Sequence, residues 1–309
     1  MSDPVDAANG VSSSSSGASS VGSSSTAASS GTVQAPQQPP QPLKLQEDDV
    51  PTANQDEAIM AQEKAIEKEI SDSIPLIDTK KPLISLESEY AMDDTVYQEK
   101  LRDLESRYAF IRKTRPDGNC FVRAFGFAYL ESMLSDIDEL RRFKDLLARS
   151  RDELKALGFP DFTIDDFHDT FSDVLKRLEE KPTLDELHNV FNDKGPSEYM
   201  VVFLRLLTSG QLQKEADFFG AFIEGDRSLK DFCRQEVEPM YKESDHIHII
   251  ALTRHLSTGV RVLYMDRAST DGKVIQHTFP DDVKPRVSLL YRPGHYDILY
   301  PIGGADGDQ

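Results

Sequence analysis

PDGNCFVRAFGF, residues 116–127, places a tight turn directly before a cysteine and a run of apolar residues. Proline and glycine mark the turn, and the apolar pattern from Cys120 to Leu134 predicts a buried helix. Asp117 and Asn119 are both good helix N-caps. Cys120 would then lie in the first helical turn, where free N–H groups and the positive dipole end favour a thiolate and could stabilise an oxyanion.

This pattern alone allows two interpretations of Cys120. It could be a nucleophile, or a structural cysteine on a buried helix, because free cysteines are usually buried and inert. The second cysteine of the chain, Cys233, lies in a helical context without a glycine turn, which favours a role in the core. A disulfide between the two is not expected in a reducing cytosol.

His295 is the histidine best placed to act as a base. It follows Pro293-Gly294 and begins a short strand-like run, and Asp297 stands two positions later. Residues i and i+2 of a strand point to the same side, so the Asp297 carboxylate can reach the His295 ring. A thiolate enzyme needs such an imidazole, often held by a third group. Most His-x-Asp pairs are structural, and this pair indicates a catalytic role only because Cys120 is also present.

The other histidines predict no metal centre. His246 and His248 have the spacing of a metal-binding pair, but no cysteine or third histidine stands nearby to complete a site, which favours a structural pair. His277 falls on a short strand-like run. Three more lie in charged helical stretches and are expected at the surface, namely His168, His188 and His255. We therefore expect neither a metal nor another cofactor.

Composition separates the N-terminal region from the rest of the 309 residues. Residues 1–50 are mostly Ser, Ala, Gly, Gln and Pro and are expected to be disordered, because they offer too few large apolar side chains to offset the entropy of ordering. The net charge of −19 excludes a general attraction to nucleic acid or anionic membranes. No apolar run has the length of a membrane span, and the N-terminus lacks a secretory signal pattern, so we expect an intracellular, soluble chain.

Helical patterns come first and strand-like runs come last. The segment 54–71 predicts a helix with Ile59, Ile66 and Ile70 on one stripe and Met60 at its edge. A second partly helical stretch, 85–108, is followed by the helix after Cys120 and by helices expected near 138–156, 165–179, 183–192, 197–209, 211–224 and 228–236. Residues 244–256 fit a helix or a strand. Strands are expected at 260–264, 277–279, 287–291 and 296–300. This order suggests an α+β domain with an antiparallel or mixed sheet covered by helices.

Several long stretches resemble one known family, the otubains, a branch of the ovarian-tumour-domain (OTU) deubiquitinases. The resemblance begins with PDGNCFVRAFGF and covers about residues 54–300. It is also carried by DEAIMAQ (56–62), YAFIRKTRPDGNC (108–120), FTIDDFH (162–168), LRLLTSG (204–210), FIEG (222–225), EVEPMYKESDHIHIIAL (236–252) and LLYRPGHYDILY (289–300). Val122 departs from the family pattern, which commonly has an aromatic residue there, and we expect altered packing beside the nucleophile.

The resemblance implies a papain-like OTU cysteine protease fold, with helices packed around a small, mostly antiparallel sheet and an N-terminal helical arm. It implies a domain division into residues 1–50 (tail), 51–84 (arm), 85–301 (catalytic domain) and 302–309 (disordered C-terminus). Matching positions make Cys120 the nucleophile, His295 the general base and acid, Asp297 its orienter, and Asp117 part of the oxyanion loop. The arm residues Ile59, Met60, Ile66 and Ile70 would contact ubiquitin or a conjugating enzyme.

Two functions follow from the resemblance, and they can coexist. The first is hydrolysis of ubiquitin–ubiquitin isopeptide bonds, with preference for lysine-48-linked chains. The second is non-catalytic inhibition of ubiquitin transfer through binding of ubiquitin-charged E2 conjugating enzymes. A papain-type protease acting on ordinary peptides is a weaker third alternative, because the C-G-S-C-W-type signature is missing. The expected partners are ubiquitin, polyubiquitin and E2 enzymes, and we expect a monomer in the cytoplasm, with the nucleus as an additional location.

Overall fold

The structure is a computed structural model that describes residues 57–62, 65, 69, 73–180, 183–268 and 272–303. The predicted disordered segment 1–50 and residues 304–309 of the predicted disordered C-terminus 302–309 lie outside the described residues. So do Ile66 and Ile70 of the predicted arm. Residues 57–62 of that arm are helical, as the sequence pattern predicts.

Among the described residues, six strands form one sheet in the order β1-β2-β6-β5-β3-β4. Only the pair β3 and β5 is parallel, and every other pair is antiparallel. The strands are β1 (Lys81–Pro82), β2 (Tyr108–Arg112), β3 (Gly259–Tyr264), β4 (Ile275–Phe279), β5 (Pro285–Arg292) and β6 (His295–Pro301). This mostly antiparallel sheet with helices around it confirms the predicted α+β fold.

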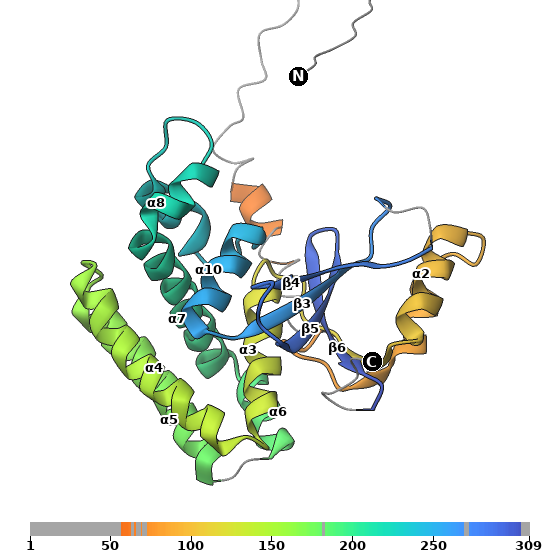
Figure 1. Ribbon diagram of the computed structural model, residues 1–309, viewed down its shortest axis with the longest axis horizontal. Helices are drawn as coiled ribbons and strands as arrows, with labels where there is room; N and C mark the ends of the chain where they lie inside the picture. Colours follow the sequence, from red (N-terminus) through yellow and green to blue (C-terminus); the bar gives the residue numbers. More distant parts are fainter. Residues whose placement is uncertain are drawn as a thin grey trace, which may run out of the picture. The chain divides into compact units, whose positions relative to one another are not determined.

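The sheet separates two hydrophobic cores, because alternate residues of a strand face opposite sides. Val262, Leu289 and Ile298 face the larger core together with α3 (Cys120–Met133). Leu263, Leu290 and Leu299 face a smaller core with η1 (Leu83–Glu89) and α2 (Thr95–Glu105). Figure 1 shows the same arrangement, with α2 on one side of the sheet and the main helical layer on the other.

Helix α3 is the centre of the helical layer. Nearly all its side chains are buried, from Cys120 to Met133, and such an all-round apolar helix belongs in an interior. It packs on β5 and β6 and on three helices of the layer. The remaining helical elements are α4 (Ile137–Ala156), α5 (Asp161–Glu180), α6 (Leu184–Asn192), α7 (Lys194–Lys214), α8 (Ala216–Phe219), η2 (Gly220–Phe222), α9 (Leu229–Phe232), η3 (Cys233–Val237) and α10 (His246–Leu256).

Three helices of the layer begin directly after a polar residue that caps their N-terminus. Asp136, Thr183 and Asp193 precede α4, α6 and α7, and each side chain accepts a backbone N–H of the first turn. Buried residues of α4 then recur every three or four positions, which turns one face towards α5 and α7. The segment 244–256, which fitted either a helix or a strand, contains the helix α10. No helix among the described residues is long and apolar enough to cross a bilayer.

Two differences from the sequence-based expectation bear on the packing. Tyr108 was expected on a helix face, but α2 ends at Glu105 and Tyr108 begins β2, because pairing with β6 overrides the local helical pattern. Gly210 was expected to separate two helices, yet α7 continues through it. The glycine makes room for α4, since a Cβ at Gly210 would lie 2.7 Å from the Leu154 side chain.

Residues just before the predicted catalytic domain also take part in its packing. Leu76, Ile77 and Leu83 are almost fully buried, and β1 pairs with β2. The Ile77 carbonyl accepts a hydrogen bond from Asn192 at the end of α6. The packed fold therefore begins before residue 85, within the segment assigned to the arm.

Candidate active site

Cys120 begins α3, and the loop before it is held in an unusual backbone conformation. Gly118 has φ of +71°, and a Cβ there would lie 2.4 Å from the Tyr241 carbonyl oxygen. Only glycine fits this position without strain. The first intrahelical bond runs from Arg123 N–H to the Asn119 carbonyl. The N–H groups of the first turn therefore lack helical acceptors beside the Cys120 thiol, as an oxyanion hole requires.

Asp117 fastens this loop to the helix. Its Oδ1 accepts the Asn119 N–H at 2.9 Å, and its Oδ2 accepts Arg123 Nη1 at 2.6 Å. The Arg123 side chain is completely buried, so the ion pair joins the loop to the interior. Asp117 thus fixes the shape of the loop before Cys120 through these two contacts.

Asn119 does not cap α3 as its residue type suggested. It makes no capping hydrogen bond, and its Oδ1 instead accepts Tyr241 N–H at 3.0 Å and Arg205 Nη2 at 2.9 Å. Asn119 is fully buried, so its side chain bonds to the neighbouring loop of residues 237–243 and not to the helix. This loop and the cysteine loop are therefore held as one unit.

Arg205 of α7 is a site residue that the sequence analysis missed. Its guanidinium is buried and donates to the carbonyls of Val237, Gly118 and Lys242 as well as to Asn119. Burial lowers the pKa of Arg205 to about 10. The sequence did contain a signal, since Arg205 is the single charged residue in the apolar run FLRLLT. A cation buried in such a run needs dedicated hydrogen-bond acceptors, which predicts a structural role for it.

His295 and Asp297 lie side by side at the start of β6, as their spacing predicts. His295 Nε2 is 2.9 Å from Asp297 Oδ1. The carboxylate is fully buried and also accepts Thr114 N–H at 3.0 Å and Arg292 Nη2 at 2.5 Å. Burial opposes ionisation, but the hydrogen bond with His295 and the charge of Arg292 lower the pKa of Asp297. Asp297 is thus a fixed anion against one edge of the ring.

The other edge of the His295 ring faces Cys120. Burial lowers the pKa of His295, but Asp297 and Cys120 outweigh it through hydrogen bonding and charge and raise the pKa to about 9. Because Asp297 occupies Nε2, Nδ1 is the nitrogen left for the thiol. Nδ1 has no well-aligned hydrogen bond within the described residues, as is common before a substrate tightens a site. His295 is therefore the cationic partner that a cysteine nucleophile needs beside it.

Arg292 connects this pair to a second layer of charges. Its Nη1 donates to Glu89 Oε2 at 2.7 Å while Nη2 holds Asp297, and Lys113 forms an ion pair with the same Glu89. Arg292 and Thr114 were missed by the sequence analysis, since both approach Asp297 through the sheet. Arg292 pairs with His295 across the hairpin turn and lies five positions before Asp297, whereas Thr114 reaches Asp297 from 183 positions away.

Cys233 and the other histidines have structural surroundings. Cys233 is fully buried in a separate apolar cluster, and burial raises the pKa of its thiol to about 11. His246 Nε2 bonds to the Tyr264 hydroxyl, whereas His248 Nδ1 accepts Asp245 N–H at the start of α10, so they do not act as a pair. Among the described residues, no cluster of His, Cys, Asp and Glu could hold a metal ion.

The expected surface position is wrong for His168, which is buried, while His188 and His255 are half-buried. His168 is buried against Phe203, His188 bonds to the Ile77 carbonyl, and His255 bonds to Ser150 Oγ at 2.8 Å. Burial lowers the pKa of His255 to about 4. Charged neighbours lie on the outer faces of these helices, while the histidines face the next element.

The structure also describes three other positions that the sequence analysis named. Ile59 and Met60 of the arm are more than half exposed, at 54% and 59%. Val122, at the position that departs from the family pattern, is buried in the larger core. The small side chain is accommodated beside Cys120 without disturbing the helix.

Comparison with known proteins gives a consistent assignment. Residues 69–301 match the family described as Peptidase C65 Otubain. The chain is 53% identical to ubiquitin thioesterase OTUB1 of Homo sapiens over 264 residues, which cover 85% of this chain and 97% of that protein. It is 40% identical to human ubiquitin thioesterase OTUB2, over 74% of this chain and 96% of that protein.

A solved structure shares the fold over most of the described chain. The complex h/ceOTUB1–ubiquitin aldehyde–UBC13~Ub contains a chain that matches with a TM-score of 0.76 and 37% identity, covering 80% of this chain and 98% of that one. A family match over most of the sequence and this extent of identity agree with the site geometry. The chain belongs to the otubain family of peptidases.

Proposed function

We propose that this chain is a deubiquitinating cysteine peptidase that hydrolyses ubiquitin–ubiquitin isopeptide bonds and prefers lysine-48 linkages. The observation that carries the proposal is the grouping of Cys120, His295 and Asp297 at the ends of α3 and β6. The relatives named ubiquitin thioesterase and the complexes with ubiquitin aldehyde support ubiquitin as the substrate.

The proposed reaction uses each group in turn. The Cys120 thiolate attacks the isopeptide carbonyl, and the oxyanion lies near the N–H groups of the first turn of α3. Protonated His295 gives its proton to the departing lysine amine, which leaves a thioester on Cys120. Neutral His295 then takes a proton from water, hydroxide attacks the thioester, and ubiquitin leaves with a free carboxylate. Asp297 keeps Nε2 occupied, so the ring exchanges protons through Nδ1.

The test is cleavage of di-ubiquitins of every linkage by the wild type, Cys120→Ser and Cys233→Ser. We expect cleavage of the lysine-48 dimer by the wild type and by Cys233→Ser, and none by Cys120→Ser. Equal loss in both variants would contradict the assignment of the nucleophile. Equal cleavage of all linkages would contradict the preference alone.

We propose a second function for the N-terminal arm, which is binding of ubiquitin-charged E2 enzymes to inhibit ubiquitin transfer. Solved complexes of related OTUB1 chains with UBC13~Ub and UBCH5B~Ub support it, as do the exposed apolar side chains of Ile59 and Met60. Ile66 and Ile70 complete the proposed apolar stripe.

This second function is separable from the first. Cys120→Ser should still inhibit ubiquitin transfer by UBC13 in a chain-assembly assay, whereas Ile59→Asp/Met60→Asp should lose inhibition. Met92→Asp is a matched control, because Met92 is 94% exposed elsewhere on the surface. Inhibition that disappears with Cys120→Ser, or equally with Met92→Asp, would contradict the proposed role of the arm.

A further inference from the structure

The buried Asp297 carboxylate lies on the side of the sheet that η1 covers. Asp297 stands two positions before Leu299, which packs with η1 in the smaller core, and residues two apart on a strand face the same side. Arg292, which pairs with His295 across the β5–β6 turn, donates Nη2 to Asp297 Oδ2 at 2.5 Å. Glu89, the last residue of η1, accepts Nη1 of the same arginine at 2.7 Å. An element outside the β5–β6 hairpin therefore reaches the candidate active site through Arg292.

Glu89 joins the two groups that hold Asp297 from either side. Its Oε2 accepts Arg292 Nη1, and its Oε1 accepts Lys113 Nζ. Lys113 directly precedes Thr114, whose N–H donates to Asp297 Oδ1 at 3.0 Å. The contacts thus form a closed ring, which runs from Glu89 through Arg292 to Asp297 and returns through Thr114 and Lys113. Because the ring is closed, both donors to the buried carboxylate are fixed relative to each other.

Glu89 supplies a negative charge from a fixed position. Burial opposes its ionisation, but hydrogen bonds from Lys113 and Arg292 lower its pKa, so the side chain is ionised at neutral pH. The next residue, Tyr90, stacks on Tyr97 of α2 with ring centres 4.6 Å apart. The end of η1 is thereby attached to α2, and Glu89 approaches Arg292 from a packed element.

The charge of Glu89 also bears on the protonation of His295. Arg292 and Lys113 are cations, and Glu89 is the carboxylate that they share. Replacement of Glu89 by a neutral residue would leave both cations near the imidazole, and like charges disfavour its protonated form. The other charged or titratable groups on the elements around the ring stay the same in such a variant. They are Cys120, Asp297, Glu243, Asp245, Tyr90, Tyr291 and Tyr296.

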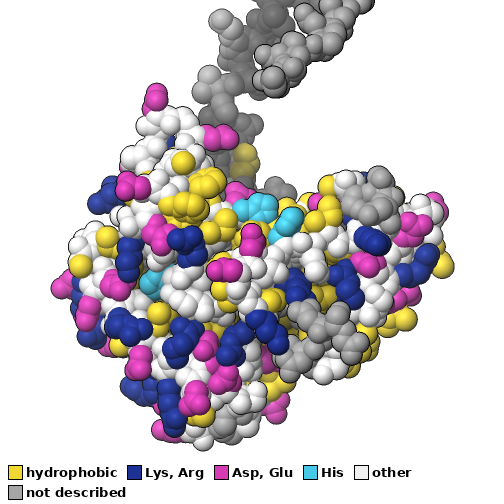
Figure 2. Space-filling view, viewed as in Figure 1, with side chains coloured by type: hydrophobic (Ala, Val, Ile, Leu, Met, Phe, Trp, Pro, Cys, Tyr) yellow, Lys and Arg dark blue, Asp and Glu magenta, His cyan; other side chains and the backbone are white. Residues whose placement is uncertain are grey.

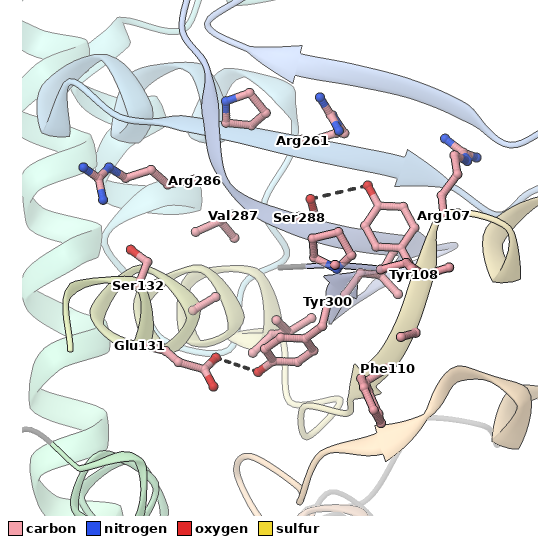
Figure 3. Close-up of a pocket in the computed structure, with 18 of the residues that line it drawn as sticks. Arg107, Tyr108, Phe110, Glu131, Ser132, Arg261, Arg286, Val287, Ser288 and Tyr300 are labelled. Atoms are coloured by element: carbon pink, nitrogen blue, oxygen red, sulfur yellow. Dashed lines mark hydrogen bonds between the residues drawn. The ribbon is translucent and has the colours of Figure 1, made fainter. Parts of the chain in front are cut away.

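An ion pair at the surface does not by itself indicate a function. Cationic and anionic side chains are interspersed over the face that Figure 2 shows, and exposed ion pairs contribute little stability. Strand β5 provides a comparison, because Arg286 at its other end donates to Asp136 at 2.8 Å, with both side chains 36% exposed. Figure 3 shows Arg286 at the edge of the groove that Ser132 and Tyr300 also line.

The two arginines of β5 differ in what lies behind them. Arg292 is 19% exposed and holds Asp297, which is fully buried. Arg286 is near a second carboxylate, that of Glu139 at 3.8 Å, which belongs to the first turn of α4. Ser132 and Tyr300, which line the groove beside Arg286, stand near the ends of α3 and β6, whereas the candidate active site lies where these elements begin. Of these two ion pairs, only the Glu89–Arg292 pair is thus connected to the candidate active site.

We propose that Glu89 is a positioning residue for the peptidase reaction and acts through Arg292 on the Asp297 carboxylate. This inference rests on the proposed function. Glu89 contacts Arg292 and Lys113, and no reacting atom. It keeps both donors to the carboxylate in place and balances the charge of the two cations, so that the His295 ring stays oriented and protonated.

The test compares Glu89→Gln with Asp136→Asn, which removes the carboxylate partner of Arg286 at the other end of β5. For Glu89→Gln we expect kcat for lysine-48-linked di-ubiquitin to fall about threefold with KM unchanged, because a charged hydrogen bond to Arg292 is lost. The falling limb of the pH profile of kcat/KM, which follows deprotonation of His295, should move to lower pH by about half a unit. Asp136→Asn should change neither quantity.

Two further variants separate the charge of Glu89 from its geometry. Glu89→Asp keeps the charge, so the falling limb should stay near its wild-type position and part of the loss in kcat should be recovered. Glu89→Gln/Lys113→Gln removes one charge of each sign, so the limb should return towards the wild-type position. A residue that only anchors η1 to the sheet would instead lower the melting temperature and leave the limb in place.

Histidine NMR of the full chain follows the titration of His295 without turnover, and His295→Gln assigns its signal. We expect the titration to move to lower pH in Glu89→Gln and not in Asp136→Asn. An active wild type whose His295 titrates at the same pH in Glu89→Gln would overturn this inference alone. Equal shifts in Asp136→Asn, or a double variant whose limb stays displaced, would also overturn it. A correctly folded wild type that cleaves no di-ubiquitin would overturn the proposed function, and this inference with it.

Discussion

Cys120 and Cys233 are both inaccessible to solvent, with 3% and 0% of their surface exposed, yet their surroundings give opposite chemistry. Cys233 lies among apolar side chains from α7, α8 and α10, and burial raises the pKa of its thiol to about 11. Cys120 lies beside a histidine whose opposite edge is held by a buried carboxylate. Burial alone therefore does not distinguish the two thiols, and under the proposed function the fixed imidazole partner makes Cys120 the reactive one.

Exchange of the Cys120 sulfur for oxygen gives the largest expected effect on activity. Cys120→Ser should lower kcat/KM for lysine-48-linked di-ubiquitin by about 10³-fold or more, because a hydroxyl is a far weaker nucleophile than a thiolate. Gel-based cleavage under single-turnover conditions measures this loss. If Cys120→Ser retained a tenth of the wild-type activity, Cys120 would not be the nucleophile.

Asp297→Asn tests the buried carboxylate that holds His295 beside Cys120 and has no counterpart near Cys233. It removes the charge that fixes His295, so kcat/KM should fall by about 10²–10⁴-fold. Asp138→Asn is a control, because Asp138 is 89% exposed on α4. If both variants lose activity equally, the buried carboxylate has no special role.

The pH dependence of kcat/KM sharpens the same comparison. Because the pKa of His295 is raised to about 9, the wild-type profile should hold through neutral pH and fall as pH rises through 9. In Asp297→Asn the falling limb should move to lower pH, towards the ordinary histidine value of about 6.5. The stabilisation of the fold by protonated His295 should likewise be complete below about 6.5 and lost as pH rises through the folded pKa. A wild-type profile that falls near 6.5 would contradict the account.

Arg292 acts as a positioning residue, and its effect should be smaller. Arg292→Gln removes one charged hydrogen bond to Asp297, which costs about 1.5–3 kcal/mol. We expect kcat to fall about tenfold with KM little changed, and Arg292→Lys to recover part of the loss. Stopped assays over a range of substrate concentrations separate the two constants. A change in KM alone would assign Arg292 to substrate binding.

Cys233→Ser should have the smallest effect on activity and a clear effect on stability. Cleavage should stay within about twofold of the wild type, while the free energy of unfolding falls by about 1–3 kcal/mol because a hydroxyl is buried among apolar groups. Urea unfolding followed by circular dichroism measures the change. Lost activity with unchanged stability would reverse the roles assigned to the two cysteines.

Local sequence patterns predicted those parts of the molecule that depend on neighbouring residues. The turn at Gly118, the burial of α3 and the pairing of His295 with Asp297 all follow from spacing within a few positions. The α+β class followed from helical patterns before residue 240 and strand-like patterns after residue 258. The resemblance to the otubains supplied the roles that spacing alone left open.

Long-range contacts were beyond the reach of those patterns. The strand at Tyr108 forms because β6, almost two hundred residues later, pairs with it. Arg205 reaches the site from α7, and nothing near it in the sequence identifies its partners. Asn119 was expected to cap a helix, but tertiary burial assigned its side chain to Arg205 and Tyr241.

The most direct test of the account is covalent labelling by ubiquitin that carries a C-terminal electrophile, followed by peptide mapping of the adduct. The account predicts one adduct on Cys120, none on Cys233, and no labelling of Cys120→Ser. An adduct on Cys233, or labelling that persists in Cys120→Ser, would contradict the claim that the His295–Asp297 pair makes Cys120 the nucleophile.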